Sequence, residues 1–185
     1  MQLWVGLGNP GAQYALHRHN IGFMAADAVA EVHGFSPWTK KQKGLIADGR
    51  IGHERVLLLK PQTFMNDSGA SVRAALDFYK LDASDITVFY DELDLAPFRV
   101  KVKRGGGAAG HNGIRSMIAH VGEDFRRVRL GIGHPGHKDR VTGYVLGNFA
   151  KAEMDDLSDL LGALAREAPT LAAGDEARFM SDLAR

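Results

Sequence analysis

Short apolar runs alternate with segments of helical periodicity along most of this chain, and this alternation limits the possible folds more than any other feature. Apolar runs bounded by glycine, proline or polar residues predict strands over residues 2–7, 56–59, 86–90, 100–102 and 128–132. Apolar residues spaced three or four apart predict helices over residues 21–32, 72–79, 114–121, 154–164 and 177–183. We therefore predict an α/β sandwich in which helices flank a twisted, mixed and mostly parallel sheet, built as a single domain from residues 1–185.

The sequence contains no cysteine among its 185 residues. This absence excludes disulfide bonds, zinc sites built on thiolates and cysteine nucleophiles. The first residues lack the basic and long apolar stretches of a signal peptide, and no apolar run reaches the roughly 18 residues that a membrane span needs. We therefore expect a soluble cytoplasmic protein that does not contact a membrane.

Charge is unevenly distributed along the chain, although the formal net charge is only +1. Residues 95–140 hold ten Lys or Arg and three Asp or Glu, whereas residues 150–185 hold four bases and eight acids. A basic surface attracts polyanions such as nucleic acids. The asymmetry therefore predicts a basic face for a polyanion, unless these charges scatter over the surface once the chain has folded.

A glycine-rich motif of the form G-x-G-x-x-G, Gly6–Gly11, directly follows the first predicted strand. A dinucleotide site needs a helix that starts within this turn, and an acidic residue about 20 positions later. Here the clearer helical pattern begins only after Asn20, and a second copy of the motif at Gly131–Gly136 also has proline at its fifth place. These features favour tight turns after strands, so we expect no nucleotide cofactor.

Polar residues gather at the predicted ends of strands and starts of helices. In α/β sheets, binding crevices form outside the carboxyl ends of the strands, where such residues meet. For the asparagines the alternative is helix capping, because Asn is a favoured N-cap residue. Capping and substrate binding are compatible, since a helix N-terminus also presents free N–H groups. The residues concerned are Asn9, His19, Asn20, Asn66, Asp91, His111 and Asn112.

Among these residues, His19 is the best candidate for a general base. An imidazole with a pKa near 6.5 can take a proton from water at neutral pH, and a carboxylate such as Asp91 would hold its tautomer. A lone histidine is more often structural, so this pairing is a hypothesis. No Gly-x-Ser-x-Gly motif is present, which favours activated water as the nucleophile. A metal site is weakly indicated, because no His-Glu-x-x-His motif accompanies the close histidine pairs.

Several longer motifs together resemble the bacterial-type peptidyl-tRNA hydrolase family. They occur in the order expected for that family over residues 5–147, and motifs of this length and order are highly specific. The residues that carry the resemblance are Val5–Gly11 with Tyr14, Arg18–Asn20 with Gly22, Lys60–Gly69, Asp91–Leu95, Gly105–Gly113, Arg129–Gly136 and Gly143–Gly147.

The resemblance implies hydrolysis of the ester bond between a peptide and the 3′-terminal ribose of tRNA, which recycles tRNA for translation. It implies a metal-independent enzyme that works as a monomer without cofactors and binds the acceptor end and 5′-phosphate of peptidyl-tRNA. By position, the catalytic residues are His19 and Asp91, and the 5′-phosphate is held by Lys103 and Arg129. Residues 135–145 match a mobile lid. The implied substrate-binding residues are Asn9, Tyr14, Met65, Asn66, His111 and Asn112.

The sequence departs from the family pattern at two places. Ala108 and Ala109 stand where the family often has further Gly or His, which predicts a stiffer or differently placed loop because each Cβ restricts the backbone. His17 stands where a small hydroxyl residue is common, and we expect its ring to point into solvent. The family match gives little support to residues after about 150.

Two other classes of function remain open at this stage. A module that binds the tRNA end without catalysis would not need a base, so the His19/Asp91 pair argues against it. A metal-dependent hydrolase would be inhibited by chelators. Both alternatives can be tested in one assay of tRNA release.

Overall fold

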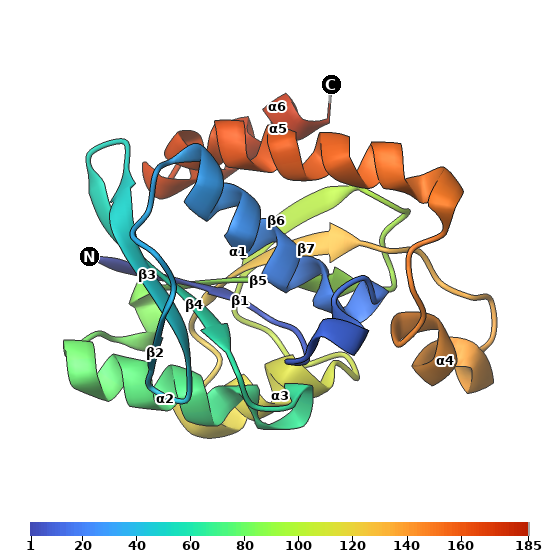
Figure 1. Cartoon of the computed structure of the whole chain (residues 1–185), viewed down its shortest axis with the longest axis horizontal. Coiled ribbons are helices and arrows are strands. Elements are labelled where there is room, and N and C mark those ends of the chain that lie inside the picture. The colour runs from blue at the N-terminus through green and yellow to red at the C-terminus, as the bar shows by residue number, and fades with distance from the viewer. Residues whose placement is uncertain (185) are drawn as a thin grey trace.

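The strands form one seven-stranded sheet in the computed structural model, which describes residues 1–184 (Figure 1). Their order across the sheet is β2-β3-β4-β1-β5-β7-β6. The central strands β4, β1, β5 and β7 run parallel, and β2, β3 and β6 pair antiparallel at the two edges. The predicted mixed sheet is confirmed. The strand bounds are β1 Gln2–Gly6, β2 Thr39–Lys41, β3 Gly44–Ile51, β4 Glu54–Pro61, β5 Ile86–Glu92, β6 Val100–Arg104 and β7 Arg126–Gly131.

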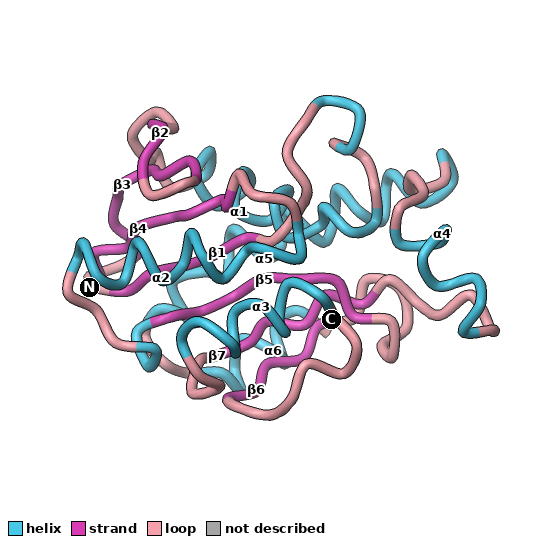
Figure 2. Tube along the Cα trace, turned by 90° about the horizontal axis from the view of Figure 1, so that it is seen from below, coloured by secondary structure: helices cyan, strands magenta, loops and turns pink. Residues whose placement is uncertain are grey.

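Helices cover both faces of this sheet, so the predicted α/β sandwich is also confirmed. Helices α1, α5 and α6 lie on one face, and α2 and α3 lie on the other (Figure 1). The short helix α4 stands apart at one end of the molecule (Figure 2). Within residues 1–184, no helix is long and apolar enough to cross a membrane. The helix bounds are α1 Ile21–Val32, α2 Ser68–Tyr79, α3 Asn112–Val121, α4 Val141–Val145, α5 Met154–Ala172 and α6 Glu176–Leu183.

The central strands are apolar on both faces, because each face is covered by helices. Trp4 and Phe89 face α1 and α5, whereas their neighbours Val5 and Val88 face α2 and α3, and all four are fully buried. Burying one side chain of this size stabilises the fold by about 1.5–3 kcal/mol. Two such cores hold the carboxyl ends of β1, β4 and β5 in fixed positions.

The glycines of the first G-x-G-x-x-G motif serve packing. Helix α1 begins only at Ile21, so no helix starts within the turn, as the sequence indicates. A Cβ atom on Gly6 would lie 2.2 Å from the carbonyl oxygen of Gly22. The glycine at position 6 therefore lets α1 approach the end of β1 at backbone distance.

Three elements, two strands and one helix, differ from the prediction in the following way. Strands β2 and β3 were not predicted, because charged residues interrupt their apolar pattern. Helix α5 continues past the predicted end at residue 164 and contains Pro169. Proline lacks the N–H that would bond to the carbonyl oxygen of Ala165. That oxygen instead contacts His33 Nε2 at 2.7 Å, which compensates for the missing bond.

Candidate active site

A cleft of about 610 Å³ opens at the carboxyl ends of β1, β4 and β5. Asn9 follows β1, Met65 and Asn66 follow β4, and Asp91 lies near the end of β5. This is the position where open parallel sheets bind ligands. The structure brings together most of the residues predicted for the site, and those that line the cleft are Asn9, His19, Met65, Asn66, Asp91, His111 and Asn112.

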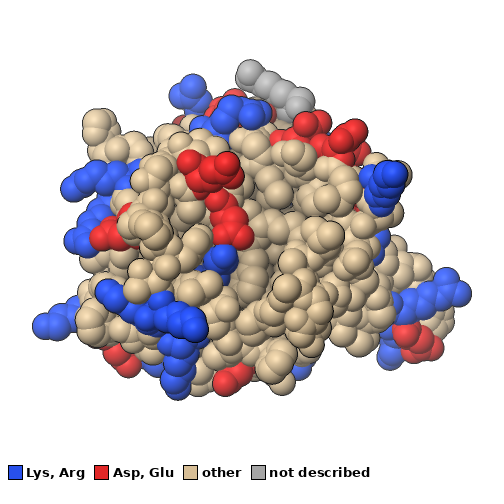
Figure 3. Space-filling view, in the orientation of Figure 1, with Lys and Arg blue, Asp and Glu red and all other residues tan. Residues whose placement is uncertain are grey.

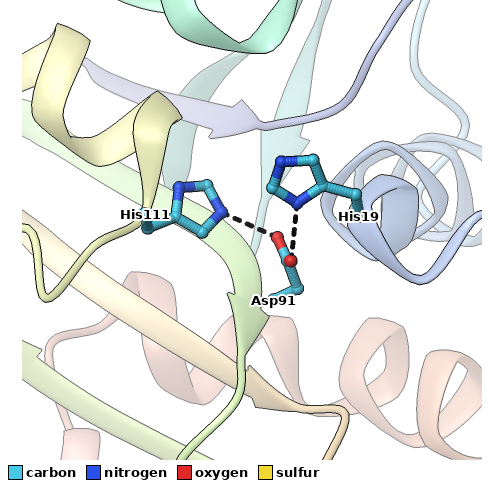
Figure 4. A group of neighbouring side chains, drawn as sticks. All are labelled: His19, Asp91 and His111. Carbon is cyan, nitrogen blue, oxygen red and sulfur yellow. Dashed lines mark hydrogen bonds and ion pairs between the residues drawn. The ribbon is translucent and has the colours of Figure 1, made fainter. Parts of the chain in front are cut away.

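Two histidines share one buried carboxylate at the centre of the cleft (Figure 4). His19 Nδ1 lies 2.6 Å from Asp91 Oδ2, and His111 Nε2 lies 2.7 Å from Asp91 Oδ1. His19 belongs to a 3₁₀ turn, Arg18–Asn20, just before α1, and His111 directly precedes α3. Each carboxylate oxygen therefore faces one imidazole ring.

The tautomer of His111 is set by its second role as the N-cap of α3. Its Nδ1 accepts hydrogen bonds from the backbone N–H groups of Gly113 and Ile114, at 3.1 and 3.2 Å. Nδ1 therefore carries no proton, and Nε2–H donates to Asp91. The other oxygen of Asp91 then accepts a hydrogen bond from His19 Nδ1–H. In this tautomer His19 Nε2 carries a lone pair and no proton.

Charge and burial in this group act in opposite directions. Burial lowers the pKa of His19, but the charge of Asp91 and its hydrogen bond outweigh burial and raise this pKa above 6.5. Burial would raise the pKa of Asp91, but the two histidines hold it well below its usual range. Asp91 is therefore ionised throughout the neutral pH range.

The same three side chains offer atoms that could bind a metal ion, since one ligand atom from each lies within 4.8 Å of the others. A metal on His111 Nε2 would need a lone pair there while Nδ1 accepts two backbone N–H groups. A neutral imidazole has only one such lone pair, so this arrangement would require an imidazolate. The hydrogen-bonding pattern therefore favours protons over a metal between these groups.

Asn9 is held rigidly on the opposite wall. Its backbone N–H donates to Asn20 Oδ1 and its carbonyl oxygen accepts from Asn20 Nδ2, both at 2.9 Å. Its side-chain Oδ1 accepts from the backbone N–H of Met65 at 2.7 Å. Because this oxygen is already bonded, the remaining NH₂ group of Asn9 is a donor available to a ligand in the cleft.

The capping alternative for the asparagines is wrong. Asn20 occupies the N-cap position of α1 but makes no capping bond, since its side chain binds Asn9. Asn66 lies in a 3₁₀ turn, Met65–Asp67, before α2, and Asn112 is the first residue of α3, which His111 caps. Asn112 Oδ1 accepts from Arg115 at 3.1 Å, so its NH₂ group is also a donor.

Tyr14 and His17 lie beside the cleft, not in its wall. The ring of Tyr14 is 6.5 Å from Phe64, which does line the cleft, and 5.3 Å from the ring of His17. The expectation that His17 points into solvent is wrong, because its Nδ1 is buried without a partner in residues 1–184. The neighbouring aromatic ring and the start of the segment after the lid cover it.

Lys103 and Arg129 lie outside the cleft, on strands β6 and β7. Lys103 pairs with Arg127 across these strands, and Lys101 pairs with Arg129. Val128 points to the core on the α5 side, so Arg127 and Arg129 point to the α3 side. The Nε of Arg129 donates to Glu92 at 3.0 Å, and the Lys103 ammonium lies against Gly106.

The acidic end of the chain lies on the other face. Helices α5 and α6 carry most of these acids, and Figure 3 shows acidic side chains along the upper rim of the molecule, where Figure 1 places α5. Lys103 and Arg129 therefore lie on the opposite face of the sheet from the acids of α5 and α6, although other charges, such as Arg126 beside Glu176, lie on the acidic face.

Fully buried Arg127 holds the glycine-rich loop that leads to His111. Its guanidinium donates to the carbonyl oxygens of Gly106 and Gly107, at 2.5 and 2.6 Å. Ala109, one of the two departures from the family pattern, has φ of +47°, a left-handed conformation that favours glycine. The loop thus reaches the cleft with a strained residue at this position, and Ala108 lines the cleft.

Residues 135–145, the segment expected as a lid, form one wall of the cleft together with Leu146, and residues 135–146 are called the lid below. They contain a 3₁₀ turn, Lys138–Arg140, and helix α4. The segment lies beside the cleft, and its role as a mobile lid stays a prediction. The lid residues that line the cleft are Lys138, Val141, Thr142, Val145 and Leu146.

Sequence reasoning missed four cleft residues that follow or support the catalytic group. Tyr90 packs its ring edge 5.1 Å from His111, and burial and the charge of Glu92 raise the pKa of Tyr90 to about 12. Phe64 is 60% exposed at the mouth of the cleft. Phe64, Glu92 and Leu93 lie within the motifs that carry the family resemblance, and Tyr90 directly precedes Asp91, so each had a signal in the sequence. The four residues are Phe64, Tyr90, Glu92 and Leu93.

A sheet with a ligand cleft at its carboxyl edge and a histidine held by a buried carboxylate defines an α/β enzyme with acid–base chemistry. Residues 3–185 match the sequence model of the family described as Peptidyl-tRNA hydrolase. The chain belongs to this family and is a hydrolase.

Similar proteins agree over the whole chain. Peptidyl-tRNA hydrolase of Sphingopyxis alaskensis is 74% identical over 184 residues, which are 100% of this chain and 97% of that protein. The enzyme of Erythrobacter litoralis is 70% identical with the same coverage. A crystal structure of peptidyl-tRNA hydrolase from Acinetobacter baumannii superposes with a TM-score of 0.92 at 38% identity, covering 99% of this chain and 94% of the other. The similarity includes the sheet and both helical layers.

Proposed function

We propose that the chain hydrolyses the ester bond between the peptide and the 3′-terminal ribose of peptidyl-tRNA, with His19 as the general base. The observation that carries this proposal is that His19 lines the cleft with its Nδ1 2.6 Å from Asp91 Oδ2, and in the neutral ring this contact leaves the Nε2 lone pair free. This arrangement orients a base toward the cleft, which a module that only binds tRNA would not need.

The reaction follows from the polarity of the groups around the cleft. His19 Nε2 takes a proton from water as the water oxygen attacks the ester carbonyl. The NH₂ groups of Asn9 and Asn112 are available to stabilise the negative charge that develops on the carbonyl oxygen. The tetrahedral intermediate then expels the ribose oxygen, which takes the proton back from the His19 imidazolium. Met65 and Asn66 line the cleft beside the peptide.

The proposal includes a metal-independent mechanism. His111 uses Nδ1 to cap α3 and Nε2–H to bind Asp91, so neither nitrogen is available to a metal. We also infer that residues 1–185 act as one monomeric domain in the cytoplasm, where peptidyl-tRNA is formed. The family match over residues 3–185 supports this extent.

The test of the proposed function is release of tRNA from purified peptidyl-tRNA in the presence of a chelator. Rapid release supports the ester hydrolysis and its independence from metal. Binding without release would leave a tRNA-binding module as the better interpretation, and release that stops with the chelator would point to a metal-dependent hydrolase.

Lys103 and Arg129 are proposed to bind the tRNA 5′-phosphate. The hydrogen bond to Glu92 engages Nε of Arg129 and leaves both Nη groups for a phosphate. Both residues point to the α3 side of the sheet. Arg129 lies on β7, next to β5, and Lys103 lies on β6, one strand further out. With about 4.8 Å between strands, the two charges lie within reach of an RNA end whose ester occupies the cleft.

Replacing Lys103 or Arg129 with alanine should weaken binding of peptidyl-tRNA and reduce the slope of log K against log[salt] by about 0.7–0.9 for each phosphate that the variant no longer neutralises. Hydrolysis of a short peptidyl ester without the tRNA body should be unchanged. The measurement is KM for both substrates at several salt concentrations.

Arg104→Ala is the matched control, because Arg104 lies on the same strand but points to the other face and contacts Asp124. It should leave the salt dependence unchanged. Equal losses of activity on tRNA and short-ester substrates in the Lys103 and Arg129 variants would contradict phosphate binding by these residues.

The pH dependence should report the protonation of His19. Because its pKa is raised above 6.5, the imidazole loses its proton only above that pH, and only the neutral form is a base. We therefore expect kcat/KM to rise with pH through a midpoint above 6.5 and to fall tenfold per pH unit well below it. A rate that stays constant from pH 5 to 8 would contradict this role.

A further inference from the structure

Arg18, the residue directly before the proposed base, contacts the segment that joins the lid to α5. The Arg18 backbone N–H donates to the carbonyl oxygen of Gly147 at 2.9 Å. The Phe149 N–H donates to the carbonyl oxygen of Leu16 at 3.0 Å, and His17 and Asn148 form a β-bridge. The segment before His19 and the segment after the lid are therefore joined by backbone hydrogen bonds.

The Arg18 side chain adds contacts to three parts of this region. Its guanidinium carbon lies 4.3 Å from the centroid of the Tyr144 ring in α4 and 5.6 Å from that of Phe149. One Nη donates to the carbonyl oxygen of Asn148 at 2.9 Å, and the other forms an ion pair with Glu153 at 2.8 Å. The side chain is only 13% exposed.

These contacts connect the lid to the catalytic turn through one side chain. Tyr144, which stacks on Arg18, also donates its hydroxyl to the carbonyl oxygen of Ile132 at the end of β7. A movement of α4 away from the cleft would break the stacking on Arg18. Since Arg18 and His19 share the same 3₁₀ turn, loss of this stacking removes one of the contacts that hold the turn that carries the base.

We propose that Arg18 is a positioning residue that sets the place of His19 by fixing its turn to the lid. This inference rests on the proposed role of His19 as base. The flat face of a guanidinium can stack on an aromatic ring while its two Nη groups donate hydrogen bonds in the plane of the group. The ammonium group of lysine cannot do both. When the lid contacts Arg18, the His19 ring is held in its position in the cleft. When the lid moves away, both Arg18 and the turn that carries His19 lose a contact.

The test compares wild type with Arg18→Lys, which keeps the positive charge and the long apolar stem. We expect kcat to fall about tenfold or more with KM for peptidyl-tRNA unchanged, because a misplaced base affects only the transition state. The same relative fall is expected for a short peptidyl ester. A fall confined to KM, or to the tRNA substrate, would overturn the inference.

A second readout follows the titration of His19 itself by NMR, without turnover. The titratable groups that face this ring or line its cleft are Tyr90, Asp91 and Glu92 on β5, His111 before α3 and Lys138 on the lid. In Arg18→Lys, the midpoint of His19 should move from its raised position toward the ordinary 6.5. An unchanged midpoint together with an unchanged kcat would show that Arg18 has only a structural role.

Two substitutions of Tyr144, a residue of the lid, separate the stacking on Arg18 from the other contact of this side chain. Tyr144→Leu removes the ring that stacks on Arg18, and Tyr144→Phe keeps the ring but removes the hydroxyl that bonds to Ile132. The inference predicts that only the leucine variant lowers kcat and shifts the His19 midpoint. Equal effects of both substitutions would contradict it. Failure of the proposed function would be seen differently, as full activity in a variant that lacks His19.

Discussion

His19→Ala should lower kcat by about 10²–10⁴, the usual contribution of a positioned general base, and should leave the fold intact. His19 is buried beside Asp91, and both residues line the cleft. Removal of the imidazole therefore enlarges the cleft, and water from the cleft can solvate the Asp91 carboxylate. The measurement is release of tRNA from peptidyl-tRNA with a chelator present, with circular dichroism and the melting temperature to establish that the variant is folded.

Two further substitutions sharpen this result. His19→Asn keeps a donor for Asp91 but has no base, so it should be as inactive as the alanine variant. His53 is an exposed histidine in the turn between β3 and β4, and His53→Ala should keep wild-type activity. Activity near that of the wild type in His19→Ala would remove His19 from the mechanism.

Asp91→Asn should be almost as damaging as loss of His19, with an expected fall in kcat of about 10²–10⁴, because it reverses the tautomer of the base. The same change in a Ser-His-Asp triad costs about 10⁴ for this reason. His111 must keep Nε2–H, since its Nδ1 caps α3, and it therefore takes the amide oxygen. The amide NH₂ then faces His19 Nδ1, which must accept, and the proton moves to Nε2.

The tautomer can be observed directly. In ¹⁵N spectra of the wild type, the proton of neutral His19 should be on Nδ1, and in Asp91→Asn it should be on Nε2. Asp94→Asn, an exposed acid three residues further along, is the control that should change neither the tautomer nor kcat. Retention of the Nδ1–H tautomer in Asp91→Asn with full activity would contradict the assigned hydrogen-bonding pattern.

The sequence predicts the central fold and the position of most of the cleft, because these depend on short-range patterns. The apolar runs within β1 and β5 are short and compact, whereas arginines alternate with apolar residues in β7, and each run is followed by turn residues. Strand ends in such a sheet meet at one edge, so Asn9 and Asp91 could be placed together from the strand pattern alone.

The remaining features depend on contacts between distant residues. The side chain of Asn20 has the local signature of a helix cap, but it bonds to the backbone of Asn9, eleven residues away. The Nδ1 atom of His17 is buried because Tyr14 and the segment after the lid cover it. The extension of α5 beyond Pro169 depends on His33, which contacts the Ala165 carbonyl across 132 residues. These three features could not be predicted from a local sequence pattern.

The bonded side-chain oxygens of Asn9 and Asn112 restrict what the cleft can recognise. Each oxygen already has a protein donor, Met65 N–H in one case and Arg115 in the other, so the NH₂ group is the part of each amide without a partner in residues 1–184. Such groups seek carbonyl oxygens, which every residue of a peptide carries in its main chain, proline included. If the proposed roles of Asn9 and Asn112 hold, hydrolysis should not depend on the side chains of the peptide, and one enzyme would serve unfinished chains of any composition.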